Sequence, residues 1–276
     1  MEKYIDLHTH SNKSDGSYSP SELVAYAKKH SLSAIALTDH DTTDGVAEAL
    51  EAGRNEGVEV ISGIEISAKS ETETHILGYF IDINNQNLQK GLAELKKVRM
   101  MRNREVEKNL RKMGFDVTYD EAAALSGGIV GRAHFARVMM EKGYVKSVKE
   151  AFDKYLSSGR GGYSNTQKVS PKEAVELIKN AGGKAFAAHL HLMKRDDGDL
   201  FEFIKSLKSA GLDGIEGFYT EYTPKMQEKY QNLAKRLDLK ISGGTDFHGL
   251  MKPHIEIGTG LGNLKIPYSV LENMRK

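Results

Sequence analysis

The chain has 276 residues, with 39 lysines and arginines against 38 aspartates and glutamates and a formal net charge of +1. This length suits one domain with a sizeable core and an insertion, and the near-zero charge excludes a global field that attracts nucleic acid, so phosphate affinity must come from local groups or bound metals. The sequence contains no cysteine, which excludes disulfides, thiolate-bound zinc and cysteine nucleophiles and leaves nitrogen and oxygen to hold any metal.

We expect no export signal in the first residues. Met1 to Asp6 lack the apolar stretch of a signal peptide, and nowhere does the sequence offer the roughly 18 uninterrupted apolar residues of a membrane span. We therefore expect a cytoplasmic protein with no membrane partner, and nothing in the sequence indicates an obligate protein partner.

Seven short apolar runs alternate with helical patterns along the chain. Such alternation predicts an α/β fold with a parallel sheet or barrel. Two of the intervening helices start with the same signal, Ser-Pro-x-Glu at Ser19 and at Ser170, in which serine caps the helix, proline takes its first turn and glutamate completes a capping box. The predicted strands are Tyr4 to Leu7, Ala34 to Thr38, Val58 to Ile64, Ile76 to Ile81, Lys184 to Ala188, Gly214 to Gly217 and Leu239 to Ser242.

The alternation stops between about Asn84 and Val169, where the sequence is helical and charged for longer than an ordinary connection. We predict an inserted helical subdomain at 84–169, within a barrel domain formed by 1–83 and 170–276. Its first helix, predicted at Lys96 to Lys112, is strongly basic. This pattern favours a solvated face with a few i,i+4 ion pairs, and an anion-facing surface is the alternative.

Histidines and carboxylates follow the predicted strands. The first strand ends with His8 and His10, which project to one side of an extended backbone. Asp15 lies in the turn that follows, and the second strand ends in Thr38-Asp39-His40-Asp41. Unpaired polar groups at the end of a buried strand are costly, so these side chains call for a partner.

The later strands repeat this arrangement. Glu65 stands in an apolar segment at the end of the third strand, His189 follows the fifth, and Asp246 and His248 follow the last. Gathered at one end of a barrel, such groups would repel one another without a cation, so we predict a cluster of divalent ions. His75 differs because it opens its strand; either that strand runs against its neighbours or the ligand lies in the turn before it.

Several segments resemble the motifs of the PHP (polymerase and histidinol phosphatase) superfamily, and the resemblance covers nearly the whole chain. They are Asp6 to Ser11, Thr38 to Asp41, Gly63 to Ser67, His75 to Tyr79 and Gly244 to Gly249. Gly131 to Ala136 and Tyr155 to Tyr163 are similar to the branch that contains 3′,5′-nucleoside bisphosphate phosphatases and exonucleases acting on short oligoribonucleotides.

The resemblance implies a distorted seven-stranded β/α (TIM-like) barrel that holds three metals, usually manganese, zinc, iron or magnesium. We expect two or three ions here, manganese first among them. The implied ligands are His8, His10, Glu65 and Asp246 for the first ion, Glu65 with His75 and His189 for the second, and Asp15, His40 and His248 for the third.

Other roles are carried over in the same way. Glu65, Asp246 and His248 would be the catalytic residues, Asp39 would orient a ligand histidine without touching a metal, and Arg132 and His134 would face the phosphate or the nucleotide. Arg160 and Lys168 are near enough in sequence to assist or to be plain surface residues. One departure is Ala188-His189-Leu190-His191, where the superfamily usually has proline after Ala-His; we expect His191 to be exposed, with a ligand or substrate contact as the alternatives.

These expectations lead to a metal-dependent phosphoesterase that uses a metal-activated water. Its predicted substrate is a small nucleotide, and the reaction that we expect first is hydrolysis of the 3′-phosphate of a nucleoside 3′,5′-bisphosphate. The alternatives are a 5′-3′ exonuclease on short oligoribonucleotides, a histidinol-phosphate phosphatase and a non-catalytic metal-binding module.

Overall fold

The computed structural model describes residues 2–70, 72–164 and 169–276. Its centre is a sheet of eight strands in the order β7-β6-β5-β4-β3-β2-β1-β8. An isolated parallel bridge between Thr9 and Phe247 joins the end of β1 to the segment after β7, so the sheet nearly closes into a barrel. The strands are β1 (Tyr4–Thr9), β2 (Leu32–Leu37), β3 (Glu59–Ser67), β4 (His75–Tyr79), β5 (Lys184–Ala187), β6 (Gly214–Tyr219), β7 (Lys240–Gly244) and β8 (Ile266–Pro267).

Each of the seven predicted apolar runs corresponds to a strand, and the α/β barrel class is confirmed. The eighth strand, β8, has only two residues and pairs antiparallel with the start of β1. A segment of that length shows no periodicity, so the sequence did not reveal it.

Strand β4 runs antiparallel to both neighbours, β3 and β5. Its first residue, His75, pairs with Ser67 at the end of β3, and Ile76 pairs with Ala187 at the end of β5. The start of β4 therefore lies at the same rim as the carboxyl ends of the parallel strands β1, β2, β3, β5, β6 and β7. Of the two explanations for His75, the reversed strand is correct.

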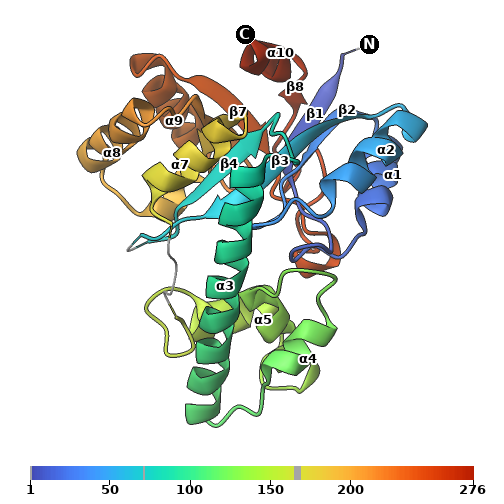
Figure 1. Ribbon diagram of the computed structural model, residues 1–276, viewed down its shortest axis with the longest axis vertical. Coiled ribbons are helices and arrows are strands. Elements are labelled where there is room, and N and C mark those ends of the chain that lie inside the picture. Colours follow the sequence, from blue (N-terminus) through green and yellow to red (C-terminus); the bar gives the residue numbers. More distant parts are fainter. Residues whose placement is uncertain (1, 71, 165–168) are drawn as a thin grey trace.

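Helices cover the outside of the barrel and its amino-terminal end (Figure 1). Helices α1 and α7 both carry the expected capping boxes, with Ser19 accepting from the Glu22 amide and Ser170 from the Glu173 amide. The apolar faces of these helices close the core around the strands. The covering helices are α1 (Pro20–Lys29), α2 (Val46–Glu56), α7 (Pro171–Asn180), α8 (Asp197–Ser209), α9 (Pro224–Arg236) and α10 (Ser269–Arg275).

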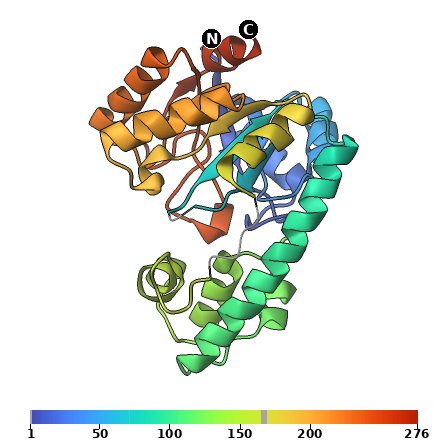
Figure 2. The ribbon, with the colours of Figure 1, turned by 60° about the vertical axis from the view of Figure 1, so that its left-hand side comes forward.

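A long helix, α3 (Gln86–Lys112), leads from the barrel to a separate group of helices (Figure 2). It begins ten residues before the predicted Lys96, because the Asn85 side chain caps it and the buried leucines of its first half, such as Leu88 and Leu92, pack with α7. The group contains α4 (Tyr119–Ala124), α5 (Arg132–Glu141), α6 (Val148–Ala151) and a π-helical turn at Phe152–Leu156.

These helices surround a small core of their own. It is formed by residues such as Val106, Leu110, Phe135, Met139 and Leu156. The boundaries at 84 and 169 stay a prediction. None of the helices in the described ranges combines the length and the apolar character that a membrane-crossing helix needs.

Candidate active site

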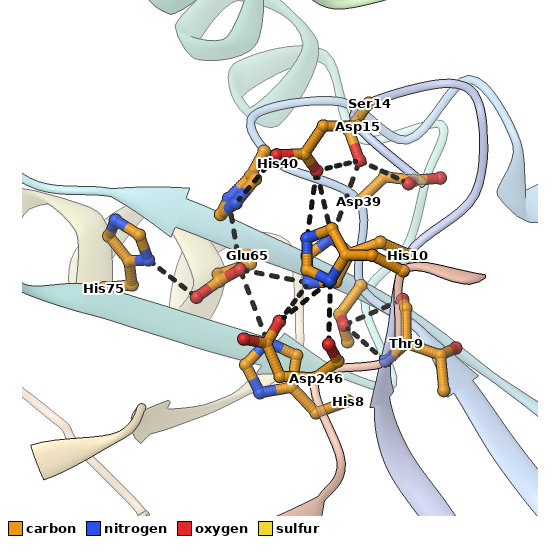
Figure 3. A network of polar contacts seen from close by, with 12 residues as sticks. His8, Thr9, His10, Ser14, Asp15, Asp39, His40, Glu65, His75 and Asp246 are labelled. Atoms are coloured by element: carbon orange, nitrogen blue, oxygen red, sulfur yellow. Dashed lines mark hydrogen bonds and ion pairs between the residues drawn. The ribbon is translucent and has the colours of Figure 1, made fainter. Parts of the chain in front are cut away.

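The candidate ligands meet at the rim where the parallel strands end and β4 begins (Figure 3). The loops that follow the strands carry most of them, which is where α/β barrels place their working groups. Apart from Asp15, whose side chain is 14% exposed, and His40, they are buried. The set brought together is His8, His10, Asp15, His40, Glu65, His75, His189, Asp246 and His248.

Glu65 occupies the centre of this set. Its Oε2 lies 3.3 Å from His8 Nε2, 3.3 Å from His10 Nε2 and 3.1 Å from His40 Nδ1. Its Oε1 lies 2.7 Å from His75 Nδ1 and 3.0 Å from His189 Nε2. Five imidazoles thus converge on the two oxygens of one carboxylate, an arrangement suited to a bridging ligand.

Two further carboxylates complete the cluster. Asp246 Oδ1 lies 3.2 Å from His10 Nε2 and 3.5 Å from His8 Nε2, and Asp15 Oδ1 lies 3.2 Å from His248 Nε2. Three groups have ligand atoms all within 4.8 Å of one another: His8, His10, Glu65 and Asp246; His10, Asp15, His40 and His248; and His40, Glu65 and His75.

The donor set fits divalent cations. Metal–nitrogen and metal–oxygen bonds of about 2.0–2.2 Å place neighbouring tetrahedral ligand atoms roughly 3.3–3.6 Å apart, close to the separations found here. Among the described residues, no hydrogen-bond partner meets four buried atoms: His8 Nε2, His10 Nε2, His40 Nδ1 and Glu65 Oε2. Leaving such atoms unpaired is costly. A cation between them removes that cost. The assignment of each residue to a particular ion stays a prediction.

The carboxylates and imidazoles strongly perturb one another. Burial lowers the pKa of His10, but Asp246 and Glu65 outweigh it and raise the pKa to about 9. Burial likewise raises the pKa of Glu65, but the imidazoles of His40 and His75 hold it well below the usual range. The raised pKa of His10 means that a proton competes with a cation for this imidazole.

Glu216 supports the cluster, and the sequence reasoning missed it. This fully buried carboxylate of β6 accepts a hydrogen bond from His8 Nδ1 over 2.9 Å and another from the His189 amide over 2.7 Å. A carboxylate behind an imidazole fixes its tautomer and presents the other nitrogen to a metal. The signal was available, since Gly214-Ile215-Glu216-Gly217 places an acid in a buried strand.

Asp39 is linked to the cluster through serines. It accepts hydrogen bonds from Ser11 and Ser14, and Ser14 Oγ lies 3.5 Å from His10 Nδ1. Burial raises the pKa of Asp39 to about 6 although these hydrogen bonds oppose it. An orienting role for Asp39 would therefore pass through Ser14.

Two residues at the rim have unusual backbone conformations. Asp246 and His189 have φ angles of 58° and 25°, in the left-handed region that non-glycine residues rarely adopt. Such conformations persist where the surrounding contacts enforce them, commonly at functional sites. Gly244 is required for a different reason, because a Cβ at this position would clash with His8 across the β1–β7 contact.

A cavity of about 400 Å³ lies above the cluster, between the barrel and the helices of residues 86–156, here called the helical segment. Its lining includes Asp15, His40, Glu65, Asp246 and His248 from the cluster. It also includes three arginines carried by helices α3 and α5. Arg99 donates to Asp41 and Ser67 of the barrel, which ties α3 to the rim. Arg102 and Arg132 are the other two.

Arg102 is a buried cation with no carboxylate partner among its hydrogen bonds in the described chain. Its side chain is bonded to the neighbouring Asn103, and its residue is 4% exposed. Burial together with Arg99 and Arg132 holds the pKa of Arg102 well below its usual range. A buried guanidinium on a cavity wall is most readily satisfied by an anion that enters the cavity.

The basic helix therefore has two faces. Lys97, Arg104, Lys108 and Arg111 are exposed and pair with nearby carboxylates, as the solvated-face prediction requires. Arg99 and Arg102 instead line the cavity. The solvated face accounts for only part of the helix.

The remaining predicted residues are placed as follows. Arg132 lines the cavity, whereas His134 is 3% exposed and its Nδ1 accepts a hydrogen bond from the Gly131 amide at the start of α5. His191 is not exposed as expected; its side chain is 15% exposed, packs near Tyr219 and lies 3.1 Å from Glu221. Arg160 is exposed on the surface, and Lys168 lies outside the described residues.

Comparison with known proteins agrees with this geometry. The PHP domain family matches residues 6–244. A 5′-3′ exoribonuclease of Haemophilus influenzae is 36% identical over 90% of this chain and 91% of its own length, and a 3′,5′-nucleoside bisphosphate phosphatase of Chromobacterium violaceum is 34% identical over 88% and 87%.

Solved structures are similar over nearly the full length. An amidohydrolase from Chromobacterium violaceum, with bound sulfate and no metal, has a TM-score of 0.89 at 32% identity and covers 99% of this chain and 96% of its own. A protein from Bifidobacterium adolescentis described as a metal-dependent phosphoesterase has a TM-score of 0.87 at 30% identity, covering 99% and 95%. The chain belongs to the PHP domain family and is a metal-dependent phosphoesterase.

Proposed function

We propose that this phosphoesterase removes the 3′-phosphate of nucleoside 3′,5′-bisphosphates. The observation that carries the proposal is the presence, in one cavity, of the ligand cluster and of the buried Arg102, which has no carboxylate among its hydrogen-bond partners in the described chain. A substrate with one phosphate would use the cluster alone. A substrate with two phosphates also satisfies the arginine.

The residues of the cluster would hold two or three divalent ions, manganese being our first choice. His8, His10, Glu65 and Asp246 would bind one ion, His75 and His189 would share Glu65 with a second, and Asp15, His40 and His248 would bind a third. Bound ions supply an activated water and neutralise charge on the phosphoryl oxygens. The chain's own part is to orient these ligands, chiefly through Glu216 behind His8 and through the Ser14 link to Asp39.

The second phosphate would be held by the helical segment. Arg132 sits at the first turn of α5, and one of its guanidinium nitrogens donates to the Leu156 carbonyl, which fixes the side chain against the wall. Arg102 approaches from α3. A guanidinium binds a phosphate edge with two parallel hydrogen bonds, so these two side chains can select a dianionic group at a set distance from the cluster.

Relatives support this choice of substrate class. One is named a 3′,5′-nucleoside bisphosphate phosphatase, and the similar Chromobacterium structure carries sulfate, a tetrahedral oxyanion of the same shape as phosphate. A 5′-3′ exonuclease on short oligoribonucleotides is the second candidate, because relatives from Haemophilus influenzae and Escherichia coli, at 36% and 34% identity, are named 5′-3′ exoribonucleases. Histidinol phosphate has no such support.

A phosphate-release screen with manganese tests the proposal. The substrates are adenosine 3′,5′-bisphosphate, 5′-phosphorylated RNA oligonucleotides, histidinol phosphate and p-nitrophenyl phosphate, compared by kcat/KM. We expect the bisphosphate to be the best of the four. A clear preference for the oligonucleotides would favour the exonuclease instead.

Variants of the arginines show whether the cavity wall selects the substrate. Arg102→Met and Arg132→Met should each lower kcat/KM for the bisphosphate by about 10- to 150-fold, the value of roughly 1.5–3 kcal/mol for a charged hydrogen-bonded pair. They should change p-nitrophenyl phosphate hydrolysis far less. Arg104→Met on the exposed face of the same helix is the matched control, and equal losses on both substrates would contradict selective recognition.

A further inference from the structure

A lysine stands at the edge of the cluster without a role in the proposals above. Lys252 follows the short 3-10 helix Gly249–Met251 after β7 and lines the cavity. Its Nζ donates a hydrogen bond to Asp246 Oδ2 over 2.6 Å, and its side chain is 36% exposed. The ammonium group therefore lies between the candidate ligands and the open space of the cavity.

The two oxygens of Asp246 face different neighbours. Oδ1 lies against the imidazoles of His8 and His10, whereas Oδ2 accepts from Lys252 and, over 3.0 Å, from the Tyr219 hydroxyl. The hydroxyl is a neutral donor and already holds Oδ2 in place. Orienting the Asp246 carboxylate therefore does not require Lys252.

A positive charge at this position carries an electrostatic cost. A lysine beside a ligand of divalent cations repels them, and the repulsion is strong where burial limits screening by water. A neutral donor would satisfy Asp246 without that cost. The placement is favourable when an anion also enters, because the ammonium and the cations then attract the same group.

The ammonium also has donors to spare. A lysine carries three N–H donors, of which one is directed at Asp246. No second acceptor for Lys252 lies among the described residues, so the other donors can meet an oxygen placed over the cluster from the cavity side. Arg102 and Arg132 come from the helical segment, so among the described lining residues Lys252 is the lysine or arginine that the barrel contributes beside the ligands.

We propose that Lys252 is a catalytic residue that donates a hydrogen bond to a non-bridging oxygen of the phosphoryl group being transferred. In the step, a water gives up a proton as its oxygen forms the new bond to phosphorus, the ester bond to the leaving oxygen breaks, and the leaving oxygen takes up a proton. Lys252 keeps its own protons throughout and stabilises the charge on the phosphoryl oxygens. The inference rests on the phosphoesterase activity and applies to any phosphate monoester bound at the cluster.

Three lysine variants test this assignment. Lys252→Met removes the charge at similar length, Lys252→Arg restores a charge, and Lys265→Met removes an exposed lysine as a control for net charge. For each, kcat is measured on p-nitrophenyl phosphate and on adenosine 3′,5′-bisphosphate, metal content by elemental analysis, and affinity for inorganic phosphate by calorimetry.

For Lys252→Met we expect kcat to fall about 100- to 1,000-fold on both substrates, as when one preorganised donor to a transition state is removed. Affinity for inorganic phosphate should weaken, while metal content stays at the wild-type level. Lys252→Arg should recover part of kcat, and Lys265→Met should stay within about twofold of the wild type, as surface changes usually do.

Three results would overturn the assignment. Metal loss in Lys252→Met would show that the lysine only positions Asp246, and unchanged phosphate affinity with unchanged kcat would show that it does not touch the substrate. A loss restricted to the bisphosphate would also contradict it, because the proposed contact is with the transferred group. Failure of the bisphosphate as a substrate, with the p-nitrophenyl phosphate effect intact, would instead refute the proposed function alone.

Discussion

The sharpest test of the cluster is to replace Glu65 with glutamine. The substitution keeps the size of a side chain that is 1% exposed, so the barrel should remain folded. It replaces one carboxylate oxygen by an NH2 group, which is a donor and does not ligate a cation. Because three imidazole nitrogens lie within 3.3 Å of Oε2 and two within 3.0 Å of Oε1, either orientation of the amide faces ring nitrogens.

The expected size of the effect follows from the place of Glu65 in the cluster. Changes to groups that only support metal ligands cost about 10- to 100-fold in metal affinity or activity. A carboxylate shared between sites should cost more, so we expect kcat/KM on p-nitrophenyl phosphate to fall by more than about 100-fold. Elemental analysis should also show fewer ions per chain than in the wild type.

The assay pairs kinetics with metal analysis and circular dichroism. Glu73→Gln is a suitable control because this carboxylate lines the same cavity and lies 3.9 Å from His75, yet is 40% exposed. A Glu65→Gln protein that is folded, keeps its full metal content and works within a few-fold of the wild type would refute the bridging role. Loss of the folded state would be seen directly in the spectrum.

Four other predictions follow from the same geometry. The purified protein should carry two or three divalent ions; fewer than one per chain, with no gain on adding manganese, would contradict this. Because His10 must lose its proton to bind a metal and its pKa is raised to about 9, metal affinity should rise with pH up to about 9, by up to tenfold per unit for this proton; a flat profile between pH 6.5 and 8.5, in competition with a chelator, would be inconsistent. Glu216→Gln should weaken metal binding about 10- to 100-fold while the fold is kept, measured by the same competition. Arg99→Met leaves Asp41 buried without its charged partner and should lower the free energy of unfolding by about 3–5 kcal/mol, which urea unfolding would measure.

The sequence was most informative about the residues at the ends of the strands. A strand is recognised from a few consecutive apolar residues, and in parallel strands the residues that follow all meet at one rim. His8, His10, Glu65 and Asp246 could therefore be proposed as neighbours from their positions in the chain alone. The helix caps at Ser19 and Ser170 were equally local, since each involves residues three positions apart.

The sequence was less informative where the direction or the partner of a segment mattered. His75 left two explanations open, because the apolar run of β4 looks the same whichever way the strand runs. Only its pairing with β3 and β5 decided the direction. The resemblance implied that His134 faces the phosphate or the nucleotide, whereas its Nδ1 accepts a hydrogen bond from the Gly131 amide, a contact that depends on how α5 begins.

What the sequence by itself determined is the family, the barrel class and the set of candidate ligands, because these depend on local patterns and short motifs. What only the tertiary structure decided is which groups support that set from afar. Glu216 meets His8 across 208 positions of the chain, and Arg102 reaches the cavity only because α3 is long enough to lay one of its faces against the rim. Contacts of this kind are fixed by packing between distant segments, and no local pattern in either segment specifies its partner.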